Sequence, residues 1–188
     1  MIHDIPLIIF AGGKSSRMGS DKSLLPFGGY PTLTQYQYTR LCKEFQRLYI
    51  SSKTDKFNFE CIVIKDTQEA YSPLIALCSI FERLKHDEIF ILSVDAPFVD
   101  SEVIKKILAH REPLSQSVVA KSPSGIQPLC GYYKKSILPL IHAQLEKGNH
   151  KLLDLLSLAK TKLVAFEDDT PFTNLNHPSD YQNALKLI

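Results

Sequence analysis

Two adjacent glycines near the start of the chain are followed by a cluster of cations. Gly12 and Gly13 come directly after a short apolar run. Lys14, Arg17 and Lys22 then follow in one polar segment. Glycine lets the backbone come close to a ligand and turn N–H groups toward it, and Lys and Arg supply positive charge. A tight turn with a solvated loop has a similar composition, but this loop leaves an apolar strand directly, which favours a phosphate-binding loop.

Two common phosphate motifs do not fit this segment. The pattern G-x-x-x-x-G-K-[ST] would end at Gly13, Lys14 and Ser15, but Ile8 stands where its first glycine is needed. The dinucleotide pattern G-x-G-x-x-G needs spaced glycines, whereas Gly12 and Gly13 are adjacent. The chemistry therefore has to be identified from the other polar residues along the chain.

Two aspartates follow apolar runs in the way that site residues of α/β proteins do. Asp95 ends the run 88–94, where it either caps a turn before Pro97 or binds a metal. Mg²⁺ suits such a site, since it takes one or two carboxylates together with substrate phosphates. Asp66 follows the short run 61–64 and is either a turn residue or a ligand-binding one.

A pair of asparagines lies close to the end of the chain. Asn174 and Asn176 are two residues apart, so an extended backbone would put both amides on one face. They either form a polar turn before a helix at Pro178 or bind an acceptor or a metal-bound phosphate. The acidic run 167–169 is interpreted as a solvated turn.

Apolar periodicity predicts the elements that would position these residues. Strands are expected over 5–10, 47–51, 61–64, 88–94, 117–120, 127–133, 162–166 and 172–175. Helices are expected over 33–45, 74–84, 101–108 (with Ser101 or Asp100 as cap), 135–147, 152–158 and 178–188.

The alternation of strands and helices predicts a three-layer α/β/α fold with a mostly parallel, Rossmann-like sheet. Residues 117–133 should form a local antiparallel pair across a turn. Ligands of such sheets bind beyond the carboxyl ends of the strands. This rule brings the loops 11–22, 65–73 and 95–98 to one rim.

The composition bounds the class of protein. The chain has 188 residues, of which 44% are hydrophobic and 22% charged, so one domain spanning 1–188 is expected. A net charge of +2 argues against nucleic-acid binding, and the apolar runs are too short to cross a membrane. A cytoplasmic location is expected. Four scattered cysteines and histidines without ligand spacing argue against disulfides and zinc.

The segment from Ala11 to Lys22 reads A-G-G-x-S-x-R-M-G-x-D-K, which resembles the signature of the GT-A-like nucleotidyltransferases. Within them it is most similar to the molybdenum cofactor guanylyltransferases, which attach GMP to molybdopterin. Two further segments resemble this family: V-D-A-P-F at 94–98, similar to C-D-x-P-F, and N-L-N-H-P-S-D at 174–180, similar to N-x-N-T-P-E-D.

The resemblance implies a role for each candidate residue. The turn Ala11, Gly12 and Gly13, together with Arg17, would bind the nucleotide phosphates. Lys22 would contact the triphosphate and the charge that develops on the transferred phosphorus. Asp95 would bind Mg²⁺, the expected cofactor, and contribute to nucleotide binding. The remaining expected site residues are Asp66 for the nucleotide's sugar or base, and Asn174 and Asn176 for the acceptor.

Two segments bear on the substrates. The family's G-P-L-x-G becomes Ser72-Pro73-Leu74-Ile75-Ala76, so both glycines are replaced and the choice between GTP and CTP is open. Residues 127–133 resemble the family's pterin-facing segment, but a core strand accounts for them equally well.

The reaction implied is attack of the terminal phosphate of molybdopterin on the α-phosphorus of GTP, with pyrophosphate leaving. A phosphate nucleophile is already ionised near neutral pH, so no general base is needed. GTP and molybdopterin would be the partners, with transient contacts to other molybdenum cofactor proteins, and the chain would be a monomer. The alternatives are a CTP-dependent or sugar-phosphate nucleotidyltransferase and a non-catalytic nucleotide-binding protein of this fold.

Overall fold

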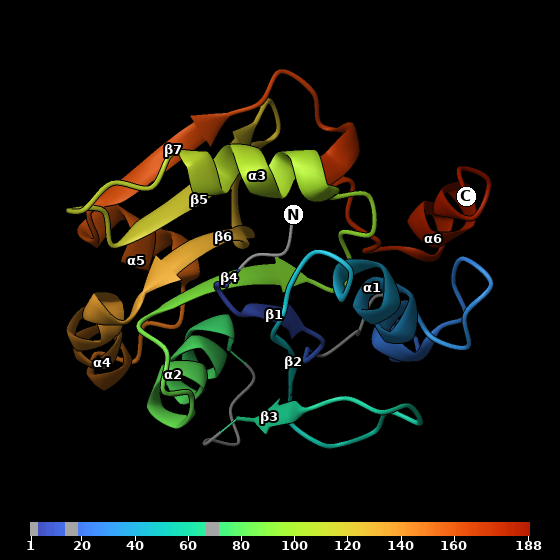
Figure 1. Cartoon of the computed structure of the whole chain (residues 1–188), viewed down its shortest axis with the longest axis horizontal. Helices are drawn as coiled ribbons and strands as arrows, with labels where there is room; N and C mark the ends of the chain where they lie inside the picture. Colours follow the sequence, from blue (N-terminus) through green and yellow to red (C-terminus); the bar gives the residue numbers. More distant parts are fainter. Residues whose placement is uncertain (1–3, 14–18, 67–71) are drawn as a thin grey trace.

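The computed structural model describes residues 4–13, 19–66 and 72–188, and it is built around a seven-stranded sheet. The strands follow one another across the sheet in the order β3-β2-β1-β4-β6-β5-β7 (Figure 1). Their bounds are β1 Leu7–Phe10, β2 Leu48–Ser52, β3 Val63–Lys65, β4 Glu88–Ser93, β5 Ser117–Ser122, β6 Gly125–Lys134 and β7 Thr161–Ala165.

The pairing is mostly parallel, as the alternation of strands and helices predicts. β3, β2, β1 and β4 run parallel to one another, and β7 runs parallel to β5. β6 is antiparallel to both β4 and β5, which confirms the expected departure. Gly125 makes the turn of this hairpin with φ +134°, a conformation that other residues rarely adopt.

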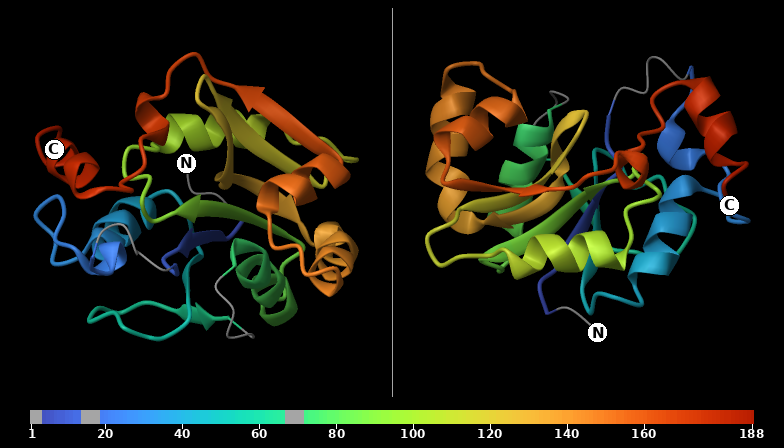
Figure 2. Two further views of the ribbon diagram at one scale, coloured as in Figure 1. Left: turned by 180° about the vertical axis from the view of Figure 1, so that it is seen from behind. Right: turned by 90° about the horizontal axis from the view of Figure 1, so that it is seen from above.

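Helices cover both faces of the sheet, so the expected three layers are confirmed (Figure 2). Both faces of the sheet are apolar and have to be covered. In strand β1, Leu7 and Ile9 belong to one apolar core, and Ile8 and Phe10 belong to the other. The first core includes residues of α1 Leu33–Leu41, α3 Ser101–Ala109 and α6 Pro178–Ala184. The second core includes residues of α2 Pro73–Arg83, α4 Leu138–Glu146 and α5 Leu152–Leu158.

Most expected elements lie within a few residues of their predicted bounds, and two helix bounds were wrong in detail. The helix expected over 33–45 ends at Leu41, although Phe45 remains buried in the core. Of the two expected caps of α3, Asp100 is confirmed and Ser101 is not, because the Asp100 carboxylate accepts a hydrogen bond from the Val103 N–H at 2.9 Å. The helix expected from 135 begins as a 3₁₀ turn, Lys135–Ile137, before α4.

The strand expected over 172–175 was also wrong. Residues Thr170–Phe172 form a 3₁₀ turn, and an irregular segment follows. Pro171 lacks the N–H that a strand would use in pairing, and the Asp168 carboxylate accepts hydrogen bonds from the N–H and hydroxyl of Thr170. In the described part of the chain, the helices are all too short or too polar to span a membrane.

Candidate active site

The glycine turn lies at the carboxyl end of the interior strand β1, which is the expected position. The Ala11 N–H donates to the Ser51 carbonyl at 2.9 Å, so the neighbouring strand holds the start of the turn. Gly13 has φ +147°, where a side chain would strain the backbone. A predicted phosphate-binding residue, Arg17, lies outside the described residues, as does Lys14.

Lys22 returns to this rim on a short 3₁₀ helix, Lys22–Leu24. Asp21 caps the helix by accepting hydrogen bonds from the N–H and hydroxyl of Ser23, at 3.1 and 2.7 Å. The Lys22 ammonium forms an ion pair with the Asp95 carboxylate and donates to the Asn176 side-chain oxygen at 3.3 Å. Three residues that are far apart in the sequence, all predicted for the site, are therefore in direct contact.

Asp95 sits just past the end of β4 and is held from several directions. Its side chain is only 13% exposed and accepts a hydrogen bond from the Ser93 hydroxyl. Its backbone carbonyl accepts from the Leu175 N–H at 2.9 Å. That last bond ties the segment that carries Asn174 and Asn176 directly to the candidate metal ligand.

A cavity of about 150 Å³ opens beside Asp95. Its lining includes both polar and apolar or aromatic side chains, which suits a flat, partly polar molecule. Its lining residues are Ser93, Asp95, Ala96, Gln127, Pro128, Leu129, Cys130, Phe172 and Asn174. The segment 127–130 thus borders the site, while Tyr132 and Tyr133 of the same strand are buried in the cores.

Asp66 lies on the same rim but away from Lys22 and Asp95. It follows β3, and the Ser51 hydroxyl of the adjacent strand β2 donates to its carboxylate at 3.5 Å. Burial raises the pKa of Asp66, and the positive charges of Lys53 and Arg83 oppose that rise. Ser51 also holds Ala11 through its carbonyl, so Asp66 flanks the glycine turn.

Two residues that sequence reasoning missed form hydrogen bonds to the backbone of the site. The Lys56 ammonium donates to the Ala11 carbonyl at 3.2 Å and forms an ion pair with Asp21, so it joins the two ends of the signature loop. The buried Gln37 amide donates to the carbonyls of Val94 and Ala96, at 3.3 and 3.0 Å. Neither residue belongs to a motif, and only the fold places them here.

The pKa of Asp21 reflects this support. Burial alone would raise it, but hydrogen bonds from Lys56 and Ser23 outweigh that effect and hold the pKa below its ordinary value. Asp21 therefore stays ionised and keeps both the 3₁₀ cap and the Lys56 contact.

The donor set at the rim fits Mg²⁺. Asp95 and Asn174 both line the cavity, and the Asn176 side-chain oxygen accepts a hydrogen bond from Lys22, which also pairs with Asp95. Such hard oxygen ligands, few in number, suit an ion that keeps several waters or substrate phosphates in its shell.

Comparison with known proteins agrees with this geometry. The MobA-like NTP transferase domain family matches residues 7–163. A protein of Campylobacter jejuni strain RM1221, named molybdenum cofactor guanylyltransferase, is 40% identical over 183 residues, which is 96% of this chain and 95% of the relative. The chain belongs to the molybdenum cofactor guanylyltransferase family. A Helicobacter pylori strain J99 protein of the same name is 34% identical and aligns with 100% of the chain and 91% of its own length.

Solved structures support the fold of this family. Molybdopterin-guanine dinucleotide biosynthesis protein A from Archaeoglobus fulgidus superposes with a TM-score of 0.82 at 17% identity, covering 97% of this chain and 98% of its own. An Anaerococcus prevotii structure, 4-diphosphocytidyl-2C-methyl-D-erythritolsynthase, has a TM-score of 0.73 at 14% identity and covers 98% and 97%. The family assignment makes the chain a nucleotidyltransferase.

Proposed function

We propose that this enzyme transfers GMP from GTP to the terminal phosphate of molybdopterin and releases pyrophosphate. The observation that carries the proposal is the contact of Lys22 with Asp95 and Asn176, between the glycine turn and the cavity. A cation, a carboxylate that would bind the metal, and amides would then surround the α-phosphorus at which the acceptor phosphate replaces pyrophosphate. The names of the C. jejuni and H. pylori relatives support the same substrates.

The chain's own groups have distinct parts in this reaction. Backbone N–H groups at Gly12 and Gly13 would bind the triphosphate, and Arg17 would add charge, as the family signature implies. The Lys22 ammonium would donate to the oxygens on which negative charge builds as pyrophosphate leaves. A fixed donor of this kind is typically worth about 3–4 kcal/mol of transition-state stabilisation.

Asp95 would hold Mg²⁺, with Asn174 and Asn176 as neighbouring oxygen donors. The ion, when bound, neutralises phosphate charge on the attacked and leaving groups. Asp95 itself is fixed by Ser93 and by the Leu175 N–H, so its carboxylate is oriented before substrate arrives.

The cavity would receive the acceptor. Its volume of about 150 Å³ and its mixed lining suit a ring system with hydrogen-bonding edges. Gln127 and Asn174 would bind those edges, and Phe172 would pack against a ring face. The acceptor phosphate is already ionised near neutral pH, so the chain needs no general base for the attack.

Asp66 would bind the ribose or the base of the nucleotide. The two residues that replace family glycines both have structural roles here: Ser72 caps α2 by accepting from the Leu74 N–H at 3.1 Å, and Ala76 packs in the core. They therefore keep the start of α2 ordered without the glycines, and the choice of GTP over CTP rests on the names of the relatives.

The test is pyrophosphate release with molybdopterin, Mg²⁺ and each of the common nucleoside triphosphates. We expect release with GTP and a product that carries guanine, identified by mass spectrometry. Release with CTP alone would replace the guanylyl assignment by a cytidylyl one. Release with a sugar phosphate but not molybdopterin would replace the acceptor. Binding of GTP without release under any condition would leave only a nucleotide-binding protein.

A further inference from the structure

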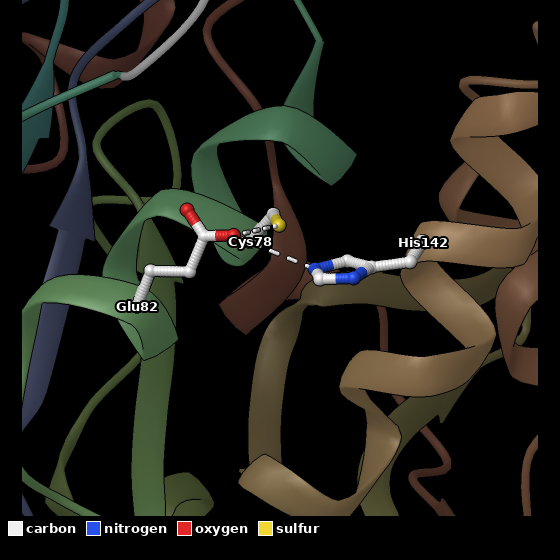
Figure 3. Close-up of side chains that lie close together, drawn as sticks. All are labelled: Cys78, Glu82 and His142. Atoms are coloured by element: carbon white, nitrogen blue, oxygen red, sulfur yellow. Dashed lines mark hydrogen bonds and ion pairs between the residues drawn. The ribbon is translucent and has the colours of Figure 1, made fainter.

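Three potential metal ligands gather on the sheet face opposite α1 and α3. Cys78 and Glu82 lie one turn apart on α2, and His142 reaches them from the facing helix α4 (Figure 3). A spacing of four residues puts the first two side chains on the same face of their helix. The third comes from a distant part of the chain, so spacing in the sequence could not indicate it.

The three donor atoms are close enough to share one ion. The Cys78 Sγ lies 3.4 Å from the Glu82 Oε1, and the His142 Nε2 lies 3.4 Å from the same oxygen. All three donor atoms lie within 4.8 Å of one another. Zinc bonds of about 2.0–2.3 Å at tetrahedral angles separate neighbouring ligand atoms by roughly 3.4–3.6 Å. Two of the three separations already have this length.

The types of donor favour zinc over a hard cation. Thiolate and imidazole are ligands of Zn²⁺ and related transition metals, whereas Mg²⁺ and Ca²⁺ prefer oxygen. A metal ion can also reach this cluster from solvent. Cys78 is buried, while the side chains of His142 and Glu82 are 52% and 43% exposed. An ion could enter from solvent, bind the sulfur at the base and keep a water as fourth ligand.

We propose that Cys78, Glu82 and His142 form a zinc site that joins α2 to α4. Binding replaces the hydrogen bond from the thiol to Glu82 with bonds to the metal, and the thiol proton passes to solvent. The site is separate from the Mg²⁺ site at Asp95, because α2 and α4 pack on the core opposite to that of Val94 and Ala96.

A zinc ion between α2 and α4 would have a structural role, because the start of α2 lies close to the nucleotide rim in the sequence. α2 begins at Pro73, just after the segment that follows Asp66 on the nucleotide rim. α4 is followed by α5, and the Ser72 hydroxyl at the head of α2 donates to the His150 carbonyl between them at 3.4 Å. An ion bound about two to three turns farther along α2 would fix the helix against α4 at a second point and stabilise the start of α2.

The experiment is a titration of the full-length, reduced protein with Co²⁺ and Zn²⁺ in excess Mg²⁺. Co²⁺ bound to a thiolate gives a charge-transfer absorption, which identifies the sulfur ligand directly. We expect one equivalent to bind with this band, and Zn²⁺ to displace it. His142→Gln should weaken Zn²⁺ binding by about tenfold or more, since it removes one of three protein ligands. Cys78→Ser should abolish the band.

Two matched variants distinguish this site from metal binding at another cysteine or at the Mg²⁺ site. Cys42→Ser removes an exposed cysteine elsewhere and should leave the band intact, as should Asp95→Asn at the Mg²⁺ site. Folding of each variant is checked by circular dichroism without metal. The proposal is overturned if the wild type shows no thiolate band, or if His142→Gln binds Zn²⁺ as tightly as the wild type. In that case the contacts are an ordinary ion pair and helix hydrogen bond. None of these outcomes depends on which nucleotide the enzyme uses.

Discussion

The ion pair of Lys22 with Asp95 shows how one contact can serve two states of the site. Their side chains are only 20% and 13% exposed, so burial removes much of the hydration of each charge. The opposite charge of the partner offsets that loss. In the ion pair the two charges compensate one another. A triphosphate offers Lys22 a stronger anion, and a divalent ion offers Asp95 a stronger cation, so both partners can be exchanged together. Asn176 lies beside Lys22 as a neutral acceptor.

Replacing Asp95 by Asn tests the metal role with little change of shape. We expect loss of pyrophosphate release at all practical Mg²⁺ concentrations, because an amide cannot replace the negative charge that the ion needs. The variant should still fold, since the Leu175 contact uses the backbone carbonyl. Turnover is measured by coupled pyrophosphate detection and folding by circular dichroism. Turnover within a few-fold of the wild type would remove Asp95 from the metal site.

Lys22→Ala tests the role of the ammonium. Loss of a preorganised donor should lower kcat by about 10²–10³-fold, with a smaller change in KM for GTP. Lys105→Ala is the matched control, because its ammonium pairs with Glu102 on the exposed side of α3. Single-turnover kinetics isolate the chemical step. An increase in KM alone would assign Lys22 to ground-state binding of the triphosphate instead.

Among the elements, α1 is the one that holds the end of β4 in place. The Gln37 amide bridges the carbonyls on both sides of Asp95, and its own oxygen accepts from the Arg40 guanidinium at 2.7 Å. Because these carbonyls lie past the regular pairing of β4, the buried side chain replaces the partners that the sheet no longer supplies. Gln37 is therefore a positioning residue for the candidate metal ligand.

Gln37→Leu keeps the approximate size of the side chain and removes its hydrogen bonds. It should destabilise the fold by about 1–3 kcal/mol, because buried polar groups lose their partners. It should also raise the Mg²⁺ concentration needed for half-maximal activity, which a purely structural residue would not do. Urea denaturation and a Mg²⁺ titration measure the two effects. Gln35→Leu on the same helix, at a half-buried position, should leave the Mg²⁺ requirement unchanged.

The signature loop depends on a second support, the ion pair of Lys56 with Asp21. The pKa of Asp21 is lower in the folded chain than its ordinary value, so the pair stabilises the fold above about pH 4 and loses this effect as pH falls through the folded pKa. Lys56→Gln should therefore reduce the dependence of stability on pH in the acid range. It should also raise KM for GTP, because the loop ends are no longer joined. Unfolding midpoints between about pH 2 and 6 and initial rates test both. Identical pH profiles would exclude the role of the pair.

Sequence reasoning succeeded where one local pattern determines the outcome. The apolar run at 7–10, the hairpin around Gly125 and the aspartate after β4 could all be predicted, because period, turn residues and strand ends are local signals. It failed at 172–175, where Pro171 and the hydrogen bonds from Thr170 to the Asp168 carboxylate overrode an apolar pattern. It could not find Gln37 or Lys56, because their partners are far away in sequence and only tertiary packing selects them.

At the scale of the whole molecule, the sheet links all parts of the chain. β1, near the start of the chain, is an interior strand, and β7 from the last quarter pairs with β5 at one edge. The final segment returns to the site, since Leu175 is buried in the core and the Tyr181 hydroxyl donates to the Pro26 carbonyl. The candidate site is thus assembled from both ends of the sequence. On this basis we propose that residues 1–188 form one domain and act as a monomer.

A single domain of this kind should unfold in one cooperative transition. Circular dichroism and tyrosine fluorescence should give the same midpoint, and the calorimetric and van't Hoff enthalpies should agree. Mg²⁺ and GTP bound at the rim should shift that whole transition, because the glycine turn, Lys22 and Asp95 come from segments that the same sheet joins. At a ligand concentration about 100 times its Kd the gain is about 2.7 kcal/mol, or roughly 5–10 °C in Tm for a chain of this length. Two resolved transitions, of which GTP moves only one, would instead indicate that the chain folds as two units and that the nucleotide is held by one of them.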